Sequence, residues 1–199
     1  PATTGNNPTN APVDEFSYDM LDRLHTLTDP LDHEINYTYN ILSQITQISL
    51  PDSKAVSYTY DNYNRLSALT ASDSHEIEYT YDSLDRTTEI SDSITGDFTY
   101  QYDTLDRITQ TTDPNNLTTS LQYDADSRLT QSVWNNQTST YTYDAASRMT
   151  SYTARGSRSY TNTFDAADRL VKTSLPSTVD AHWQYDAIYR PTNLIYTKP

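Results

Sequence analysis

The side chains that could do chemistry in this sequence are carboxylates, arginines and tyrosines that recur together. Asp82 and Asp85 lie three residues apart, a spacing that invites comparison with the paired acids of a glycosidase. A catalytic pair should be singular, however, and an Asp equivalent to Asp82 occurs in eight places along the chain. The sequence also has no nucleophile elbow and no phosphate loop, and it contains only 3 glycines. We therefore predict no catalytic residue and no enzymatic activity.

The recurring carboxylates are also poor candidates for a metal site. Equivalent carboxylates in successive copies would be too far apart to share one ion, and the chain lacks the glycine-rich nonapeptide of calcium-binding solenoids. The chain has no cysteine, and its four histidines occupy unrelated positions without a metal-ligand spacing: His25, His33, His75 and His182. We predict no metal site and no cofactor.

The element that carries these residues is a short motif, Tyr-Asp-Ser-Leu-Asp-Arg at residues 81–86, which returns with small edits. Nine copies start at Tyr18, Tyr39, Tyr60, Tyr81, Tyr102, Tyr123, Tyr143, Phe164 and Tyr185. Seven of the eight steps are 21 residues, and the step from Tyr123 to Tyr143 is 20. Self-similarity at a short fixed period indicates an array in which each unit packs mainly on its neighbours.

We assign a structural role to the Tyr, Asp and Arg of the motif. The assigned residues are Tyr18, Asp19, Arg23, Tyr60, Asp61, Arg65, Tyr81, Asp82, Arg86, Tyr102, Asp103, Arg107, Tyr123, Asp124, Arg128, Tyr143, Asp144, Arg148, Asp165, Arg169, Tyr185, Asp186 and Arg190.

Each copy divides into a strand, a tight turn, a return strand and a polar connection. Residues 77–81 alternate apolar and polar side chains with the period of a strand, residues 82–85 form the turn, and residues 107–111 illustrate the return strand. The predicted fold is all-β: tandem antiparallel β-hairpins with a period of 21, forming a coiled sheet or solenoid-like shell segment. We expect a flexible lead-in at 1–15 and nine hairpin repeats in 16–199.

The return strand does not alternate cleanly. Leu66 and Leu69 are three residues apart, which in a regular strand places them on opposite faces. Either a β-bulge or apolar cover on both faces would resolve this pattern, and the sequence leaves both open.

The turn has the residues of a three-residue hairpin loop built from a type I turn and a bulge. Asp suits its first position, where the carboxylate accepts the N–H group two residues on, and the fourth position requires a left-handed backbone. The fourth position holds Asp, Asn or Ser in eight copies and Tyr189 in the last, which is the weakest case.

One copy predicts a contact. Residues 39–44 read Tyr-Asn-Ile-Leu-Ser-Gln, so this copy alone lacks the motif Asp and it alone lacks the motif Arg. Joint loss suggests that Asp and Arg meet as charged hydrogen-bond partners, either within one hairpin or across neighbouring hairpins.

Composition limits the partners. Net charge is -14, which disfavours nucleic acid and anionic membranes, and no apolar run approaches the length of a membrane span. Of 18 tyrosines, 13 fall in two columns of the repeat, which predicts a thin aromatic core. We also expect the chain to be a piece of a longer protein.

The motif Tyr-x-Tyr-Asp-x-x-x-Arg-Leu at this period resembles the YD repeat, also called the Rhs repeat. Such repeats occur in bacterial polymorphic toxins, in the cocoon-forming subunits of insecticidal toxin complexes and in teneurin ectodomains. The resemblance covers residues 16–196, and the main departure is the absence of Gly before the Arg. It implies a strip of hairpins that coils into a hollow shell, part of a large exported or cell-surface protein, which encloses or displays a toxin or effector. The implied partners are flanking repeats or a cargo domain of the same parent protein.

An alternative from another class is a cell-surface adhesion module that binds glycan or protein through an exposed aromatic face. The candidates for stacking on such a ligand are Trp134, which precedes the Asn135-Asn136 turn, and Tyr152. Open sheet edges also predict self-association of the chain.

Overall fold

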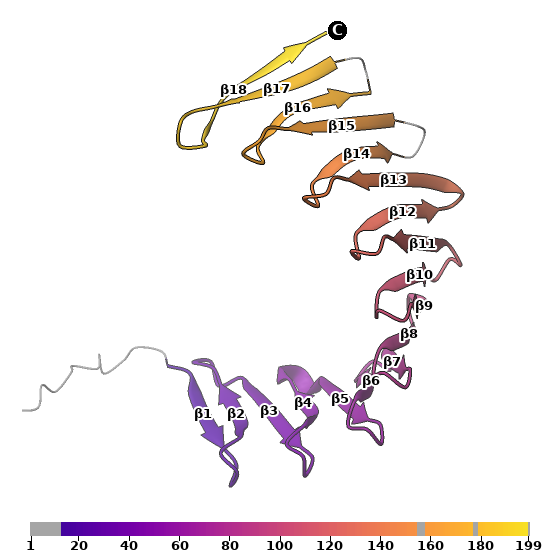
Figure 1. Ribbon diagram of the computed structural model, residues 1–199. Coiled ribbons are helices and arrows are strands. Elements are labelled where there is room, and N and C mark those ends of the chain that lie inside the picture. Colours follow the sequence, from indigo (N-terminus) through magenta and orange to yellow (C-terminus); the bar gives the residue numbers. More distant parts are fainter. Residues whose placement is uncertain (1–12, 155–157, 177–178, 199) are drawn as a thin grey trace, which may run out of the picture. The chain divides into compact units, whose positions relative to one another are not determined.

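The structure of the protein is a computed structural model that describes residues 13–154, 158–176 and 179–198 (Figure 1). The chain divides into two compact units, residues 1–97 and 98–199, and each is described by itself. The predicted lead-in at 1–15 lies outside the described residues up to residue 12, and the first strand begins at Glu15.

The first unit is an antiparallel β-meander in which each strand pairs with its neighbours in sequence. A short 3-10 helix, η1 (Pro51–Ser53), occupies one of the predicted polar connections. The strands are β1 (Glu15–Tyr18), β2 (Leu24–Thr28), β3 (Glu34–Tyr39), β4 (Ile45–Ser49), β5 (Ala55–Tyr60), β6 (Leu66–Ala71), β7 (Glu76–Tyr81) and β8 (Thr87–Asp92).

The second unit repeats the same plan, and its first strand begins two residues before the boundary at residue 98. Its strands are β9 (Gly96–Tyr102), β10 (Ile108–Thr112), β11 (Thr118–Tyr123), β12 (Leu129–Trp134), β13 (Gln137–Tyr143), β14 (Met149–Ala154), β15 (Arg158–Phe164), β16 (Leu170–Leu175), β17 (Val179–Tyr185) and β18 (Pro191–Thr197). No helix in the described parts of the chain is long and apolar enough to cross a membrane.

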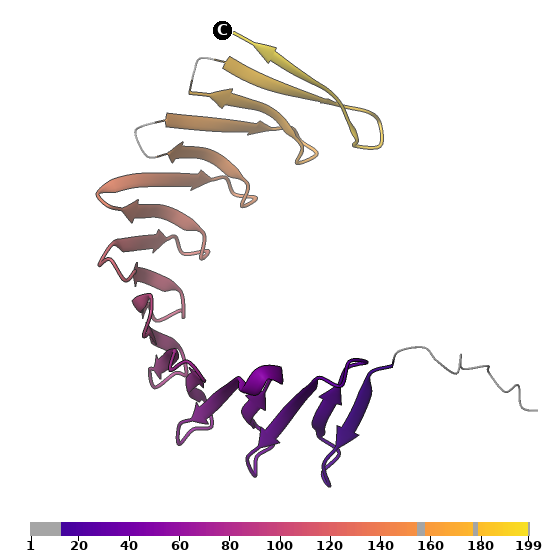
Figure 2. The same ribbon diagram turned by 180° about the vertical axis from the view of Figure 1, so that it is seen from behind.

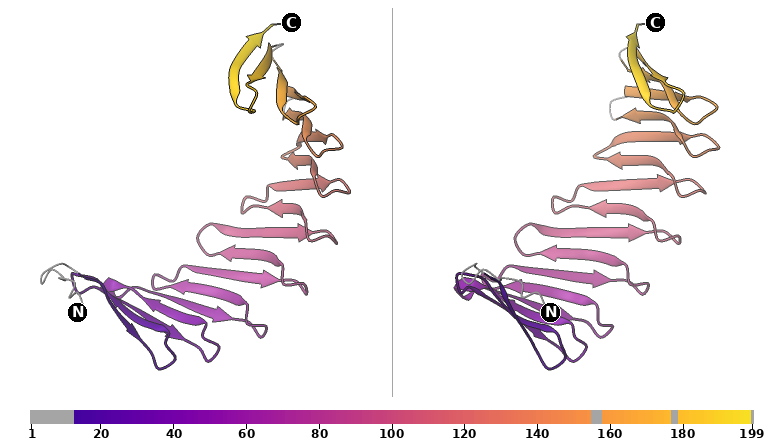
Figure 3. Two further views of the ribbon diagram at one scale, coloured as in Figure 1. Left: turned by 60° about the vertical axis from the view of Figure 1, so that its left-hand side comes forward. Right: turned by 90° about the vertical axis from the view of Figure 1, so that its left-hand side faces the viewer.

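The predicted all-β fold of tandem hairpins is confirmed. Every odd-numbered strand ends on the Tyr or Phe of the motif, and every even-numbered strand begins directly after the residue in the Arg position. Within each unit all the motif turns lie at one end of the strands, and all the polar connections lie at the other end (Figure 3).

A β-bulge resolves the irregular pattern of the return strand. In the β5–β6 hairpin Tyr58 faces Leu69 and Tyr60 faces Leu66, while the register skips Ser67. The two leucines therefore lie on the same face as the two tyrosines. The same register shift occurs in all nine hairpins.

The core of each unit is thin. Among the described residues only Ala68, Ser139 and Ala181 are buried, and the tyrosines and leucines of the apolar face are at most half-buried. In the views from the front and from behind, each unit is a single layer of strands (Figures 1 and 2). Because no second layer covers it, contacts between successive hairpins must supply much of its stability.

The turn prediction is confirmed at all nine positions. The fourth turn residue has a positive φ everywhere, from 58° at Asp22 to 68° at Tyr189. The N–H of that residue donates to the carbonyl of the first turn residue, as Asn64 does to Asp61 at 3.0 Å. The turn therefore forms without the glycine that is usual before the Arg.

We predict opposite responses to glycine at two neighbouring turn positions. Asn64 has φ of 65°. Asn64→Gly should raise the free energy of unfolding and Asn64→Ala should lower it, each by about 1 kcal/mol or less. Asn62, two residues earlier in the same exposed turn, has no positive φ, so Asn62→Gly should be neutral or destabilising. Urea unfolding of the four chains measures this. Equal effects of glycine at both positions would contradict the turn assignment.

Candidate functional site

The candidate site is a joint between successive hairpins, and it begins with the turn carboxylate. In the β5–β6 hairpin Asp61 Oδ1 accepts the backbone N–H groups of Tyr63 at 2.8 Å and Arg65 at 3.0 Å. Asp61 N–H donates to the Arg65 carbonyl at 2.9 Å. These bonds hold the Arg65 backbone beside the carboxylate, so that its side chain starts from a fixed point.

The arginine of each joint bonds both its own turn and the next one. Arg65 Nε and Nη2 lie 2.7 Å from Asp61 Oδ2, while Nη1 donates to the Asp82 carbonyl at 3.2 Å and to Asp85 Oδ1 at 2.6 Å. Its guanidinium also lies over the Tyr81 ring, with 4.5 Å from Cζ to the ring centroid. One side chain thus contacts two carboxylates, a carbonyl and a ring on two hairpins.

We call this arrangement the Arg joint: the Asp and Arg of one hairpin with the ring, first turn carbonyl and fourth turn side chain of the next. The ring contact of the joint, at 4.5–5.0 Å, occurs in six places among the described residues: Arg23 over Tyr39, Arg65 over Tyr81, Arg107 over Tyr123, Arg128 over Tyr143, Arg148 over Phe164 and Arg169 over Tyr185. The sequence left open whether Asp and Arg meet within a hairpin or across hairpins. The Asp–Arg contact lies within the hairpin, and the Arg also reaches the next one.

The motif tyrosine adds a hydrogen bond in the opposite direction. Its hydroxyl donates to the carbonyl of the first residue of the preceding return strand, at 2.7–2.9 Å. The pairs are Tyr39 with Leu24, Tyr60 with Ile45, Tyr81 with Leu66, Tyr123 with Ile108, Tyr143 with Leu129 and Tyr185 with Leu170. A half-buried phenol therefore has a partner for its polar end.

The fourth turn residue has a role that was not predicted from the sequence, as a hydrogen-bond acceptor. Its oxygen accepts Nη1 of the preceding hairpin's arginine at Ser43, Asp85, Ser127, Ser147 and Asp168. The sequence contained an indication of this role: the fourth position never holds Gly, although a left-handed backbone favours Gly there.

The copy without Asp and Arg is connected to the next hairpin through two amides. Asn40 Oδ1 accepts the N–H groups of Leu42 and Gln44, and Asn40 Nδ2 donates to Gln44 Oε1 at 2.8 Å. Gln44 Nε2 then donates to the Asn64 carbonyl of the next hairpin at 2.8 Å. Two amides thus replace an ion pair, with the side-chain donor now at the Asp position and with the fourth turn carbonyl of the next hairpin as the acceptor in place of the first.

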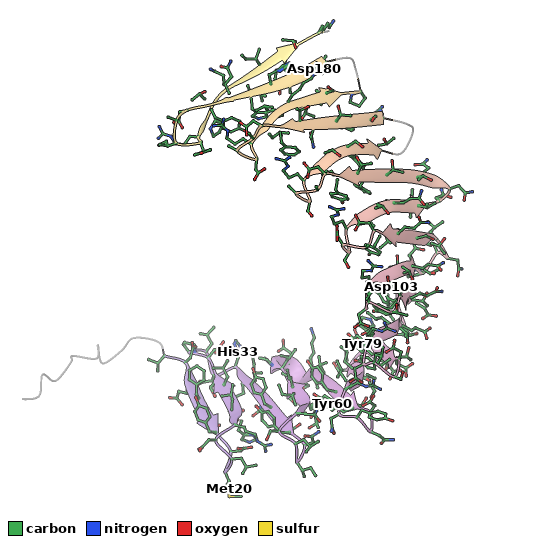
Figure 4. All side chains as sticks on the ribbon, viewed as in Figure 1. Met20, His33, Tyr60, Tyr79, Asp103 and Asp180 are labelled. Carbon is green, nitrogen blue, oxygen red and sulfur yellow. The ribbon has the colours of Figure 1, made fainter. Side chains whose placement is uncertain are left out.

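A second family of turns forms the predicted polar connections, at the other end of the strands from the motif turns. Asp29 Oδ1 accepts the N–H groups of Leu31 and His33, and the His33 ring lies 2.9 Å from Asp29 Oδ2. Asp113 likewise accepts two backbone N–H groups in its connection. In the first unit, Met20 lies at the end of the strands where the motif turns are, and His33 lies at the opposite end (Figure 4). Both connections have an Asp-Pro start followed by Asp or Asn at the left-handed position.

The motif carboxyls have lowered pKa values. The hydrogen bond from the Arg86 side chain is the main reason that the pKa of Asp82 lies below its ordinary value. The side chain of the hairpin's own Arg is likewise the main cause at Asp19, Asp103, Asp144 and Asp165. Carboxylates held in this way are ionised and fully engaged, so they are poor general acids or bases.

The two aromatic candidates for ligand stacking are half-buried. Tyr152 lies between two rings, with centroid distances of 5.1 Å to Tyr141 and 5.8 Å to Tyr160. Trp134 ends β12, opposite Gln137 across the turn. Ligand stacking on Trp134 or Tyr152 stays a prediction, and at Tyr152 both ring faces are already covered.

No group of three or more His, Asp or Glu side chains in the described ranges is placed to hold a metal ion. Asp82 and Asp85, the pair compared above with glycosidase acids, both accept bonds from arginines. The arrangement can connect hairpins, and it leaves no free catalytic pair at this position.

Two protein-family models built on repeats of this kind match the sequence. The family model for the teneurin YD-shell matches residues 10–105, and the model for the RHS repeat matches residues 102–133. This chain is a YD-repeat protein. The matched families are structural shell repeats. No curated protein matches the sequence.

Solved structures show the same fold. The YD-repeat chain is similar to chains in TcdB2-TccC3-Cdc42 (TM-score 0.54, 12% identity), a mutated Tc holotoxin pore of Photorhabdus luminescens (0.53, 12%) and TcdB2-TccC3-TEV (0.51, 13%). The matches cover 94–96% of this chain but only 13–14% of the other chains. The YD-repeat chain thus spans about a seventh of the length of each matched chain.

We predict that an ion pair in one joint can be exchanged for an amide pair. Asp61→Asn and Arg65→Gln should each lower the unfolding midpoint, because each leaves a partner of the Arg joint without its counterpart. The double variant, which copies Asn40 and Gln44, should lie closer to the wild type than either single variant. Urea unfolding of the four chains gives the coupling directly. Additive losses would show that the two side chains act independently.

The pH dependence follows from the lowered carboxyl pKa values. Because the folded pKa lies below the unfolded one, the stabilisation is complete above about pH 5 and is lost as pH falls through the range below about 4. The urea midpoint of the YD-repeat chain should therefore fall steadily from about pH 5 to pH 3. The Asp61→Asn/Arg65→Gln chain should show a shallower fall. An unchanged wild-type midpoint over this range would contradict the role of these carboxylates.

Proposed function

We propose that the YD-repeat array is a non-enzymatic wall segment of a shell in a large exported or cell-surface protein, and that the shell encloses or displays an effector. The observation that carries this proposal is the recurrence of one joint from hairpin to hairpin. A catalytic or binding site is expected to be singular, whereas a wall needs the same connection at every step. The partners would be flanking repeats or a cargo domain of the same polypeptide.

The charge distribution supports a role in which different stretches of wall face different surroundings. Residues 1–97 hold 17 of the 27 acidic and 4 of the 13 basic side chains, a net charge of -13, whereas residues 98–199 carry the remaining 10 and 9, a net charge of -1. A stretch of wall with the charge of residues 1–97 would repel an acidic cargo.

The rival function, adhesion through an exposed aromatic face, receives less support. Trp134 and Tyr152 are half-buried, and Tyr152 is enclosed by neighbouring rings. Glycan binding that is lost in Trp134→Ala but retained in Tyr196→Ala, an exposed tyrosine elsewhere, would favour adhesion over the wall.

We predict that one whole repeat can be removed. Deleting residues 61–81 joins Tyr60 to Asp82 and leaves every remaining turn and joint type in place. The shortened chain should keep its strand content per residue and a cooperative unfolding transition, because each hairpin contacts mainly its neighbours. Circular dichroism and urea unfolding measure both properties.

The matched control removes half a repeat. Deleting residues 61–71 takes out the motif turn and β6, so that β5 would meet β7 without the return strand between them. We expect this chain to lose structure around the cut. If both deletions disrupt the fold equally, the array is not modular and the wall proposal loses its basis.

The effector part of the proposal is tested on the polypeptide that carries this array. The coding sequence on both sides of these residues should include further repeats and a nuclease-like, deaminase-like or pore-forming segment. That segment should resist protease in the intact protein and become sensitive after Arg-to-Gln changes in several joints. Adhesion domains and a surface anchor in its place would favour the rival function.

A further inference from the structure

Exposed apolar side chains follow one another along the motif turns of the first unit. The third turn residue is large and apolar in each of its four hairpins, and these residues are between 55% and 77% exposed. Met20 and Ile41, at the second position of the first two turns, are almost fully exposed. Met20 lies at the tip of its turn (Figure 4). We call the third turn residues the turn row: Leu21, Leu42, Tyr63 and Leu84.

Bonds between successive turns hold the members of the turn row side by side. Arg23 Nη1 donates to the Asn40 carbonyl and to Ser43 Oγ, which belong to the first and fourth residues of the next turn. Gln44 and Arg65 bond the turns that follow. The third turn residues therefore succeed one another at the distance between hairpins, which is two strand spacings or about 9.6 Å.

The turn itself does not require large apolar side chains at the third position. In the second unit this position holds Leu105, Asp126, Ala146, Ala167 and Ile188. The turns with Ala146 and Ala167 keep the left-handed backbone at their fourth residue, with φ of 62°, and the hydrogen bond from that residue to the first. Folding of the turn therefore does not account for the turn row. A contiguous apolar patch that stays exposed is typical of an interaction surface.

The charge around the turn row restricts the partner. Residues 1–97 carry a net charge of -13. Three of their four basic side chains are motif arginines in contact with the Asp of their own hairpin, and the fourth, Lys54, lies in a polar connection at the other end of the strands. Asp22 and Asp85 are exposed beside the turn row, at the fourth turn position. This apolar and acidic surface favours a partner with apolar and basic side chains.

The spacing of the turn row fits an α-helix. Seven helical residues rise about 10.5 Å, close to the distance of about 9.6 Å between hairpins. Apolar residues at every seventh position of one helix can therefore each meet one member of the turn row. An extended strand covers the same distance in about three residues, and residues three apart lie on opposite faces of a strand. A strand could thus not present one continuous apolar face to the turn row.

We propose that the turn row binds an amphipathic α-helix of a partner protein, with apolar residues at every seventh position and Lys or Arg beside them. The apolar residues would cover the turn row, and the basic residues would pair with Asp22 and Asp85. The inference goes beyond the wall function, because it concerns the tips of the turns and leaves the Arg joints unchanged.

A synthetic helix tests the proposal on the full chain. The probe is a fluorescent peptide of about four heptads, with Leu at every seventh position, Lys beside each Leu and Ala elsewhere to favour the helix. A control peptide of the same composition has its leucines at every fifth position, so that they fall on different sides of the helix. Fluorescence anisotropy should show that the probe binds about tenfold or more tightly than the control peptide, with an affinity that falls as salt is raised.

Serine substitutions locate the contact on the chain. Leu21→Ser, Leu42→Ser and Leu84→Ser in one chain should weaken binding of the probe about tenfold or more. Tyr63 is kept, because its ring centroid lies 5.0 Å from Arg65 Cζ. The substituted side chains are exposed, so a urea midpoint near that of the wild type serves as the folding control.

The matched control chain loses the same number of exposed apolar side chains outside the turn row. It carries Leu31→Ser, Ile94→Ser and Ile188→Ser, at residues that are 66–75% exposed. This chain should bind the probe as tightly as the wild type does.

Four results would overturn the inference. A wild-type chain that does not bind the probe would contradict it directly, and equal binding of the two peptides would show that the period of the turn row does not select the partner. A folded turn-row variant that binds as tightly as the wild type would place the contact elsewhere. Binding to phosphatidylcholine vesicles that is lost in that variant, without binding of the probe, would assign the turn row to a lipid surface. The deletion of residues 61–81 tests the wall proposal separately, so either proposal can fail alone.

Discussion

The guanidinium group of the motif arginine is the interaction on which this architecture depends. Its Nε and Nη2 bond the hairpin's own carboxylate, its Nη1 reaches the next turn, and its face lies on the next ring, as Arg65 does with Asp61, Asp82 and Tyr81. A lysine could not replace it, because an ammonium group has no planar fork and no extended face. A planar group with donors on several sides can bond two hairpins at once.

The thin core explains why such a joint is needed. Only three described residues are buried, so the hydrophobic effect acts on half-covered surfaces. Tyrosine suits this situation, since its ring packs against neighbours while its hydroxyl bonds a carbonyl, as in Tyr60 with Ile45. A chain with 35% apolar residues can therefore fold as a single layer, provided that polar contacts define how successive hairpins meet.

The sequence predicted what recurs and left open what depends on distant neighbours. Hairpins, turns and their left-handed positions followed from nine copies of one motif, and even Tyr189 adopts the expected φ. The bulge beside Leu66 could not be chosen, because apolar residues three apart are compatible with two arrangements. The exposure of Tyr152 was misjudged, since the rings that enclose it come from two other strands. The turns at Asp29 and Asp113 lie outside the main motif, and there the Asp-Pro start of the polar connection indicated a turn.

The exceptions reveal what the array requires at each step. Asn40 and Gln44 bond each other and the next hairpin without charge, and where Phe164 lacks a hydroxyl, Asn162 Nδ2 donates to the Met149 carbonyl in its place. A hydrogen-bonded link between successive hairpins is therefore kept in these copies, whereas the ion pair is not. This separates the joint from the surface: residues 1–97 and 98–199 are built alike but differ in net charge by 12. The charge of such a wall can vary with what it faces while its internal connections stay the same.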